Sequence, residues 1–132
     1  MGKRTLRVLV VDDYEIVRRQ ICQLLVSQAD IEVICGAANG QEAVLKAREH
    51  RPDLVLMDVT MPMMNGLDAA RIITQELPST RVVMVSQHDS PQFMREALAV
   101  GASGYVTKSA VGRELIPHLR KLQYPHSTGW PE

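Results

Sequence analysis

The sequence predicts a single α/β domain, built on a parallel sheet with helices on both faces. Short apolar runs alternate five times with stretches of helical period. The third run, residues 54–57, is wholly apolar, which is typical of a strand buried on both faces. A length of 132 residues suits one hydrophobic core. Strands joined through helices in this way run parallel, with right-handed crossovers.

The composition is that of an ordinary globular domain, with 45% apolar and 23% charged residues. The 15 basic and 15 acidic residues cancel, so bulk charge gives this segment no means of binding nucleic acid. The apolar stretch at residues 6–11 is interrupted by Arg7 and is too short for a signal peptide or a membrane span. We therefore expect a cytoplasmic protein without a membrane partner.

The first strand is predicted at residues 5–11, which are mostly apolar and are followed directly by Asp12 and Asp13. From Tyr14 the period becomes helical, and one face gathers Val17, Ile21, Leu24 and Leu25. Residues 31–35 predict a second strand. The charged Glu32 in this strand indicates a position near a sheet edge.

The second helix is predicted to begin after Asn39, which can cap it. Glu42 stands three residues later, as in a capping box. Arg51-Pro52 ends the helix, because proline disfavours the helical conformation in the residue before it. The central strand follows at residues 53–57 and ends at Asp58.

Asn65-Gly66 turns the chain into a third helix, which Pro78 closes. The fourth strand is predicted at residues 81–85 and ends at Ser86. Ser90-Pro91 then provides a cap and a first helical residue for the fourth helix. This helix is expected to stop at Gly101, a residue that tolerates the left-handed conformation.

The fifth strand is predicted at residues 104–107 and ends at Lys108. A last helix begins at Ser109 or Ala110. We expect it to start late or to kink at Pro117, because proline removes one backbone donor. Residues 123–132 show no period and are expected to be a linker or C-terminal tail, which leaves residues 1–122 as the domain.

Polar side chains follow four of the predicted strands, at the point where each strand ends: Asp12 and Asp13, Asp58, Ser86, and Lys108. In a parallel sheet all of them meet at one edge, where ligands bind in open α/β folds. Two carboxylates about 4 Å apart repel by about 4 kcal/mol at an effective dielectric constant of about 20. A cation between the carboxylates would relieve this repulsion, and an oxygen-only set of ligands with an open face suits Mg²⁺.

Lys108 and Ser86 add a positive charge and a hydroxyl group to this edge. Together with a metal ion they would neutralise a phosphoryl group in transfer, which needs mainly positioning and charge neutralisation. A carboxylate that forms an aspartyl phosphate is an established nucleophile. The residues alone therefore predict an aspartate that accepts a phosphoryl group with the help of Mg²⁺.

Taken singly, these residues have plainer explanations. Asp12 or Asp13 would cap the first helix, Ser86 would be a turn residue and Lys108 a solvated lysine. Tyr105 would be a half-buried strand aromatic. Only the joint placement of polar residues at successive strand ends favours the functional interpretation.

Several motifs together resemble the receiver domain of bacterial two-component response regulators. They are Val10-Val11-Asp12-Asp13, Leu56-Met57-Asp58-Val59-Thr60-Met61-Pro62, Asn65-Gly66, Val85-Ser86 and Gly101-Ala102-Ser103-Gly104-Tyr105-Val106-Thr107-Lys108. The resemblance runs from about Leu6 to Leu122. Gly-Ala-x-Gly-Tyr and Lys108-Ser109-Ala110 are most similar to the NarL/FixJ-like subfamily, which carries a LuxR-type helix-turn-helix output domain. The resemblance to receiver domains implies a flavodoxin-like (βα)5 fold with strand order 2-1-3-4-5.

The resemblance also implies the role of each residue at the site. Asp58 would accept the phosphoryl group from a sensor histidine kinase and share the Mg²⁺ ion. Asp13 would bind Mg²⁺ directly, Asp12 through water and Thr60 through its backbone carbonyl. The domain would catalyse only its own phosphorylation and dephosphorylation, and would not be an enzyme in the usual sense.

A switch is implied by the same resemblance. Lys108 would pair with the phosphoryl group, Ser86 would turn its hydroxyl onto a phosphoryl oxygen, and Tyr105 would swing inward behind it. These movements would reshape the face formed by the fourth helix, the fifth strand and the fifth helix. A homodimer is expected on activation.

One residue departs from the family's pattern beside the site. Gln87 stands where receivers usually have Ala or Gly, and its longer side chain would hinder the approach of phosphodonors or of water. His88 and Thr60 flank the same place and are further candidates for tuning dephosphorylation. Gln87 keeps open an alternative function, a phospho-independent protein-interaction module on the same fold.

Two other functions fit the sequence less well. An aspartate-based phosphatase would want a second carboxylate two residues after Asp58, where Thr60 stands. A flavin-binding domain would want a Ser/Thr/Gly-rich loop after the first strand, where Asp12 and Asp13 would repel a phosphate.

A LuxR-type regulator would continue beyond the tail that ends at Glu132. The chain is therefore either a stand-alone receiver or a receiver cut from a longer protein, and the linker-like tail favours the second. Such a protein would contact DNA only through the missing output domain.

Overall fold

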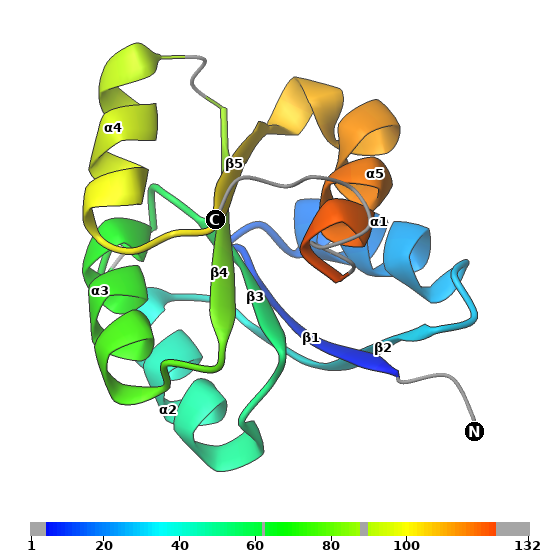
Figure 1. Cartoon of the computed structure of the whole chain (residues 1–132), viewed down its shortest axis with the longest axis horizontal. Coiled ribbons are helices and arrows are strands. Elements are labelled where there is room, and N and C mark those ends of the chain that lie inside the picture. The colour runs from blue at the N-terminus through cyan, green and yellow to red at the C-terminus, as the bar shows by residue number, and fades with distance from the viewer. Residues whose placement is uncertain (1–4, 62, 88–89, 124–132) are drawn as a thin grey trace.

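The computed structural model describes residues 5–61, 63–87 and 90–123 of the chain. Within these residues, five strands alternate with five α-helices, and a short 3₁₀ turn precedes the last helix (Figure 1). The elements are β1 (Leu6–Val11), α1 (Glu15–Val26), β2 (Ile31–Ala37), α2 (Gly40–His50), β3 (Leu54–Asp58), α3 (Gly66–Glu76), β4 (Arg81–Ser86), α4 (Pro91–Ala99), β5 (Gly104–Thr107), η1 (Lys108–Ala110) and α5 (Val111–Gln123).

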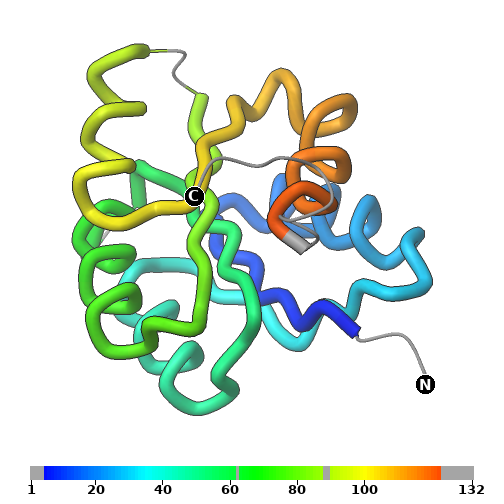
Figure 2. Tube along the Cα trace, viewed as in Figure 1, coloured from blue at the N-terminus to red at the C-terminus, as the bar shows by residue number. Residues whose placement is uncertain are grey.

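The five strands form one parallel sheet in the order β2-β1-β3-β4-β5. Helices α1 and α5 cover one face, and α2, α3 and α4 cover the other (Figure 1). The trace in Figure 2 shows how the chain leaves the sheet after each strand and returns through a helix to the next one. The predicted fold class and strand order are confirmed.

The sheet separates two hydrophobic clusters. One lies under α2, α3 and α4 and includes Leu9, Met57 and Met84, while the other lies under α1 and α5 and includes Leu56 and Leu115. All five residues of β3 are buried, as expected for the central strand of a covered sheet. Burial of each large side chain contributes roughly 1.5–3 kcal/mol to folding, so the core holds the strand ends in a fixed register.

Asparagine side chains cap two of the helices, whereas Ser90 stands at the N-cap of α4 without the predicted side-chain cap hydrogen bond. Asn39 accepts a hydrogen bond from the Glu42 amide at 2.8 Å, and Asn65 accepts one from the Asp68 amide at 2.9 Å. Glu42 reaches back as the capping box predicts, but its carboxylate accepts from the Ala38 amide at 2.7 Å, one residue before the cap. Its side chain thereby also fixes the chain where β2 ends.

The end of the chain departs from expectation at Pro117. The α5 helix begins at Val111 and runs through Pro117 to Gln123, so the predicted late start was wrong. Proline removes the donor that would bond to the carbonyl of Arg113. Because Arg113 and Pro117 are both exposed, water can satisfy that carbonyl. The buried face of Leu115, Leu119 and Leu122 then suffices to hold the helix on the sheet.

Strand β2 lies at the edge of the sheet, and Glu32 is exposed there, as predicted. Across the described part of the chain, no helix combines the length and the apolar character needed to cross a membrane. The predicted tail, residues 124–132, lies outside the described residues.

Candidate functional site

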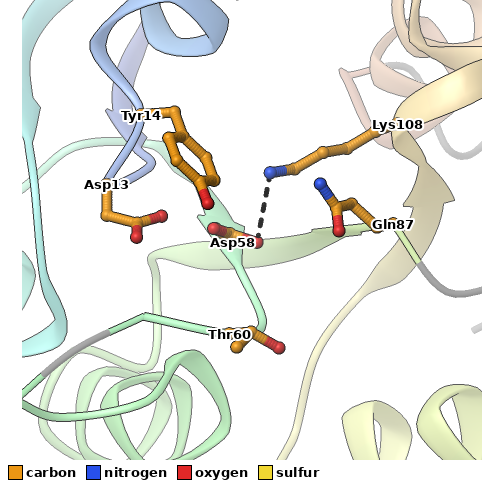
Figure 3. Close-up of a pocket in the computed structure, with 6 residues that line it drawn as sticks. All are labelled: Asp13, Tyr14, Asp58, Thr60, Gln87 and Lys108. Atoms are coloured by element: carbon orange, nitrogen blue, oxygen red, sulfur yellow. Dashed lines mark ion pairs between the residues drawn. The ribbon is translucent and has the colours of Figure 1, made fainter.

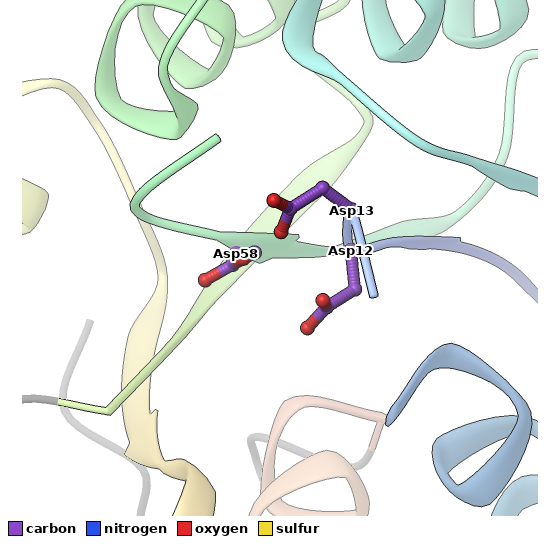
Figure 4. Close-up of side chains that lie close together, drawn as sticks. All are labelled: Asp12, Asp13 and Asp58. Carbon is purple, nitrogen blue, oxygen red and sulfur yellow. The ribbon is translucent and has the colours of Figure 1, made fainter. Parts of the chain in front are cut away.

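The sheet register brings the polar strand ends together. Val11 of β1 pairs with Met57 of β3, so Asp12 and Asp58 lie side by side one step further along. One carboxylate oxygen from each of Asp12, Asp13 and Asp58 lies within 4.8 Å of the other two (Figure 4). Three predicted site residues from two separate strand ends thus form one acidic cluster.

Asp12 is the most firmly held member of the cluster. It is only 1% exposed. Its amide donates to the Ala37 carbonyl at 3.0 Å, which extends the pairing of β1 with β2 by one residue. Its Oδ1 accepts a hydrogen bond from the Tyr14 amide at 2.9 Å. Asp12 therefore fixes the turn before α1, but it does not cap the helix as its plainer explanation predicted, because the N-cap residue is Tyr14.

Lys108 supplies the positive charge at this edge. It is the first residue of η1, directly after β5. Its Nζ lies 2.9 Å from Asp12 Oδ2 and 3.5 Å from Asp58 Oδ1, and only 14% of the side chain is exposed. Burial works against the ammonium charge, but Asp12 and Asp58 together raise the pKa of Lys108 above its ordinary value. Lys108 is therefore a charged member of the site rather than a solvated lysine.

Asp58 carries the clearest electrostatic perturbation. Burial first, and then the neighbouring charge of Asp12, raises its pKa from 3.8 to about 7, against the opposing effect of Lys108. Asp13 adds to the rise. One lysine therefore does not neutralise three carboxylates, and the cluster carries an excess of negative charge that a cation would balance.

Asp13 shows that the cluster fits a metal ion. Its Oδ1 atom is buried and finds no hydrogen-bond partner among the described residues. Buried polar atoms are normally paired, so such an atom within a group of carboxylates suits a cation ligand. The donors are all oxygens, the ligand type that Mg²⁺ prefers. The ligand atoms present are therefore of the type that the predicted Mg²⁺ site requires.

A cavity of about 130 Å³ opens above the cluster. It is lined by Asp13, Tyr14, Asp58, Thr60, Gln87 and Lys108 (Figure 3). Tyr14 and Gln87 stand on opposite sides of Asp58, and Lys108 reaches in between them (Figure 3). The space has room for a small oxyanion beside Asp58, with Lys108 as a charged wall.

The backbone beneath Asp58 is fixed by a close approach of helix α3. The Gly66 amide donates to the Val59 carbonyl at 2.8 Å. A Cβ atom on Gly66 would lie 1.9 Å from the Asp58 carbonyl oxygen, so only glycine fits at this contact. Gly66, which the sequence suggested only as a turn residue, therefore helps to place Asp58.

The predicted switch residues lie on β4 and β5, the two strands that follow β3 in the sheet. Ser86 is 1% exposed and is the last residue of β4, where it pairs with Thr107 of β5. Tyr105 is half-buried and packs against the hydrophobic cluster that lies under α2, α3 and α4. This packing fits the plainer explanation of Tyr105 as a half-buried strand aromatic. Of the predicted tuning residues, Thr60 and Gln87 line the cavity, and His88 lies outside the described residues.

Two residues at the site were not singled out from the sequence. Tyr14 lines the cavity, and Lys108 Nζ lies 5.9 Å from the centre of its ring, within range of a cation–π contact. Arg18 donates from Nη1 to the Asp12 carbonyl at 2.6 Å. Tyr14 directly follows the acidic pair, which is a usable signal. Arg18 lies in a helical stretch, and nothing in the sequence distinguishes it from Arg19.

Comparison with known proteins agrees with this geometry. Residues 8–120 match the family model described as the response regulator receiver domain. The chain is 43% identical over 124 residues to the transcriptional regulatory protein LnrK of Bacillus subtilis, covering 94% of this chain and 55% of LnrK. It is 38% identical over 128 residues to the response regulator protein VraR of Staphylococcus aureus, covering 97% of this chain and 61% of VraR. The chain thus spans somewhat more than half the length of these relatives.

A solved structure gives the same result in three dimensions. The two-component response regulator of the LuxR family from Aurantimonas sp. SI85-9A1 superposes with a TM-score of 0.87 at 36% sequence identity. The match covers 92% of this chain and 86% of that one. The likeness to LuxR-type regulators inferred from the motifs is therefore supported by both sequence and fold.

Proposed function

The chain belongs to the response regulator receiver domain family, the phospho-accepting module of two-component regulators, and on that premise we propose that Asp58 accepts the phosphoryl group. One observation carries this assignment. Asp58 ends the central strand inside a group of three carboxylates, with Lys108 Nζ 3.5 Å from its Oδ1. Asp13 and Asp58 both line the cavity, and of these two carboxylates only Asp58 forms an ion pair with Lys108 among the described residues.

In the proposed reaction, a carboxylate oxygen of Asp58 forms a bond to phosphorus. The bond from phosphorus to the donor breaks, whether that donor is the phosphohistidine nitrogen of a sensor kinase or the carboxylate oxygen of acetyl phosphate. Lys108 would pair with the phosphoryl oxygens, because its ammonium group already lies beside Asp58. Hydrolysis would later return Asp58 and inorganic phosphate, so the chain would act on no separate substrate.

Mg²⁺ is the proposed cofactor. Asp13 and Asp58 would bind it directly, Asp12 would act through water, and Thr60 would offer its backbone carbonyl. The buried, unpaired Oδ1 of Asp13 and the three clustered carboxylates support this assignment. When bound, the ion would neutralise charge on the transferring phosphoryl group.

A switch at Ser86 and Tyr105 is proposed as the output of the phosphorylation. The Ser86 hydroxyl would turn onto a phosphoryl oxygen, and Tyr105 would move inward. The face built by α4, β5 and α5 would change with them, as a two-state element biased by one new charge. The position of Ser86 at the end of β4, one strand away from Asp58, supports its part in this proposal.

The proposed context is a cytoplasmic regulator of transcription. A sensor histidine kinase would be the donor, and a homodimer would form on activation. Residues 1–122 would be the receiver, and residues 123–132 would lead to a LuxR-type DNA-binding domain. The matched relatives include a transcriptional regulatory protein, and the chain covers only 55–61% of LnrK and VraR, which supports a further domain in such proteins.

The experiment for this proposal is intact-mass measurement after incubation with Mg²⁺ and acetyl phosphate. We expect addition of one phosphoryl group to the native chain and none to Asp58→Asn. Equal addition to both would overturn the assignment of Asp58. No addition to the native chain from acetyl phosphate or from a phosphorylated kinase would favour the alternative, a phospho-independent interaction module in which Gln87 obstructs the site.

A further inference from the structure

The loop that carries Asp12 and Asp13 is tied down by a side chain from helix α1. Arg18 lies one turn into the helix, and its amide donates to the Tyr14 carbonyl at 3.0 Å. Its guanidinium group turns back and donates from Nη1 to the Asp12 carbonyl at 2.6 Å. Asp12, which begins the turn into α1, is therefore hydrogen-bonded to that helix through Arg18.

This contact completes the backbone hydrogen bonding of Asp12. The Asp12 amide is bonded to Ala37, and Oδ1 is bonded to the Tyr14 amide. The carbonyl lies beyond the last paired residue of β1 and is bonded by Arg18. Because Asp12 is almost fully buried, water would replace Arg18 poorly, and a buried carbonyl without a partner is destabilising.

A second element fixes where Arg18 lies. A Cβ atom on Gly36 of β2 would lie 3.0 Å from Arg18 Cδ and 3.3 Å from its Nε. The stem of Arg18 therefore runs directly against the backbone of β2, where a side chain on residue 36 would crowd it. Gly36 pairs with Val10, which lies two residues before Asp12. The Arg18 stem and the Asp12 carbonyl to which Arg18 donates therefore both lie at the same end of the neighbouring strands β1 and β2.

The guanidinium group of Arg18 does not pair with a carboxylate of the described residues. Across the described ranges, Arg18 forms no ion pair within 4.0 Å, although its neighbour Arg19 pairs with Glu15 at 2.8 Å. Arg18 thus holds the backbone of the loop without occupying a carboxylate oxygen of Asp12 or Asp13. The Asp12 oxygens meet Tyr14 and Lys108, and Asp13 Oδ1 has no hydrogen-bond partner among the described residues. A cationic side chain near an acidic cluster would otherwise compete with a metal ion.

We propose that Arg18 is a positioning residue for Mg²⁺, which holds the Asp12–Asp13 backbone so that both carboxylates face the metal site. This inference rests on the proposed function of the acidic cluster. Residues that orient metal ligands from behind are typically worth about 10- to 100-fold in metal affinity. The guanidinium fork suits this contact better than a lysine, because it is planar and approaches the carbonyl in a fixed direction.

The test is calorimetric titration of Mg²⁺ into the full chain without a phosphodonor. We expect Arg18→Ala to weaken Mg²⁺ binding by about tenfold or more, and Arg18→Lys to restore part of the affinity. Arg19→Ala is the matched control, because Arg19 is exposed and pairs only at the surface. Its Mg²⁺ affinity is expected to equal that of the native chain.

A second measurement needs no metal. Hydrogen exchange of the Tyr14 amide, which is bonded to Asp12 Oδ1, should quicken in Arg18→Ala and stay unchanged in Arg19→Ala. If Arg18→Ala does not fold, Gly36→Ala, which crowds the Arg18 stem, replaces it and should also weaken Mg²⁺ binding.

The outcomes separate this inference from the proposed function. Native Mg²⁺ affinity in Arg18→Ala, even with a lowered melting temperature, would overturn the role of Arg18 while the acidic cluster keeps its proposed function. Absence of Mg²⁺ binding by the native chain would overturn both.

Discussion

The ammonium group of Lys108 lies 2.9 Å from Asp12 and is held over the acidic cluster from the end of β5. Asp12 itself follows β1, so the contact joins two strands that are not neighbours in the sheet. The same ammonium group lies 3.5 Å from Asp58 (Figure 3). Lys108 is thus placed to balance charge at rest and to meet a phosphoryl group on Asp58.

Replacing Lys108 tests that role. We expect Lys108→Ala to slow phosphorylation by acetyl phosphate at saturating Mg²⁺ by about 100-fold, the usual effect of removing one donor that stabilises transferred charge. Rates measured by intact mass over time would show this. Lys121→Ala, an exposed residue on α5, serves as the control and should react at the native rate. A native rate in Lys108→Ala would remove Lys108 from the reaction.

The raised pKa of Asp58 predicts a pH-dependent stability without metal. The folded chain keeps the Asp58 proton up to a pH of about 7, whereas the unfolded chain loses it near 3.8. Between these values the unfolded chain binds fewer protons, so the free energy of unfolding falls as pH rises, by up to about 1.4 kcal/mol per pH unit. Urea unfolding at several pH values would measure the slope.

Asp58→Asn should remove this slope, because its amide does not titrate. The variant should be more stable than the native chain at pH 8, by roughly 2–4 kcal/mol. Asp68→Asn changes an exposed carboxylate at the start of α3 and is the matched control. An unchanged slope in Asp58→Asn would show that another group causes it.

The affinity of the chain for Mg²⁺ should depend on pH through the same protonation of Asp58. Mg²⁺ competes with protons for the cluster, so its apparent affinity should rise steeply up to pH 7 and level off above that value. Mg²⁺ titrations at pH 5.5, 6.5, 7.5 and 8.5, about one unit apart around the Asp58 pKa, would reveal the curve. An affinity that does not vary with pH would argue against Asp58 as a metal ligand.

The close approach of α3 to Asp58 predicts an asymmetric effect of two glycine substitutions. Gly66→Ala should lower the free energy of unfolding by about 2 kcal/mol or more, because its Cβ would lie 1.9 Å from the Asp58 carbonyl oxygen. Gly112→Ala in α5 meets no atom within 4 Å and should be neutral or slightly stabilising, since alanine favours helices. Equal effects in thermal unfolding would contradict the contact.

Gln87 is expected to shield the aspartyl phosphate from water, because its side chain lines the cavity above Asp58. Gln87→Ala should therefore shorten the lifetime of the phosphorylated form. Decay of the phosphorylated mass, after removal of the donor, measures that lifetime. Gln92→Ala on α4, an exposed side chain bonded to Glu96, is the control. Equal lifetimes in the native chain and Gln87→Ala would dispose of the shielding role.

Much of the fold and of the acidic cluster could be predicted from the sequence because both depend on strand ends. Apolar runs fix where a strand stops, and parallel register then brings Asp12, Asp58 and Lys108 to one edge. The cap at Asn39 was equally predictable, since it involves a contact between residues only three apart.

Other features depend on contacts that no local pattern encodes. Arg18 reaches the Asp12 carbonyl only because Gly36 of another strand leaves room for its stem. Tyr14 lines the cavity only because the turn after β1 carries it there. At Pro117, local preference predicted a late start of the helix, but the buried face of α5 holds the helix on the sheet from Val111 onward.

The most direct measurement is to locate the phosphoryl group on the native chain. After phosphorylation with acetyl phosphate and Mg²⁺, borohydride reduction converts an aspartyl phosphate to homoserine, and tandem mass spectrometry then reads its position. We predict homoserine at position 58 alone, and none in samples lacking Mg²⁺. Homoserine at position 12 or 13, or a modified chain with aspartate intact at position 58, would contradict the assignment of Asp58 as the phosphoacceptor.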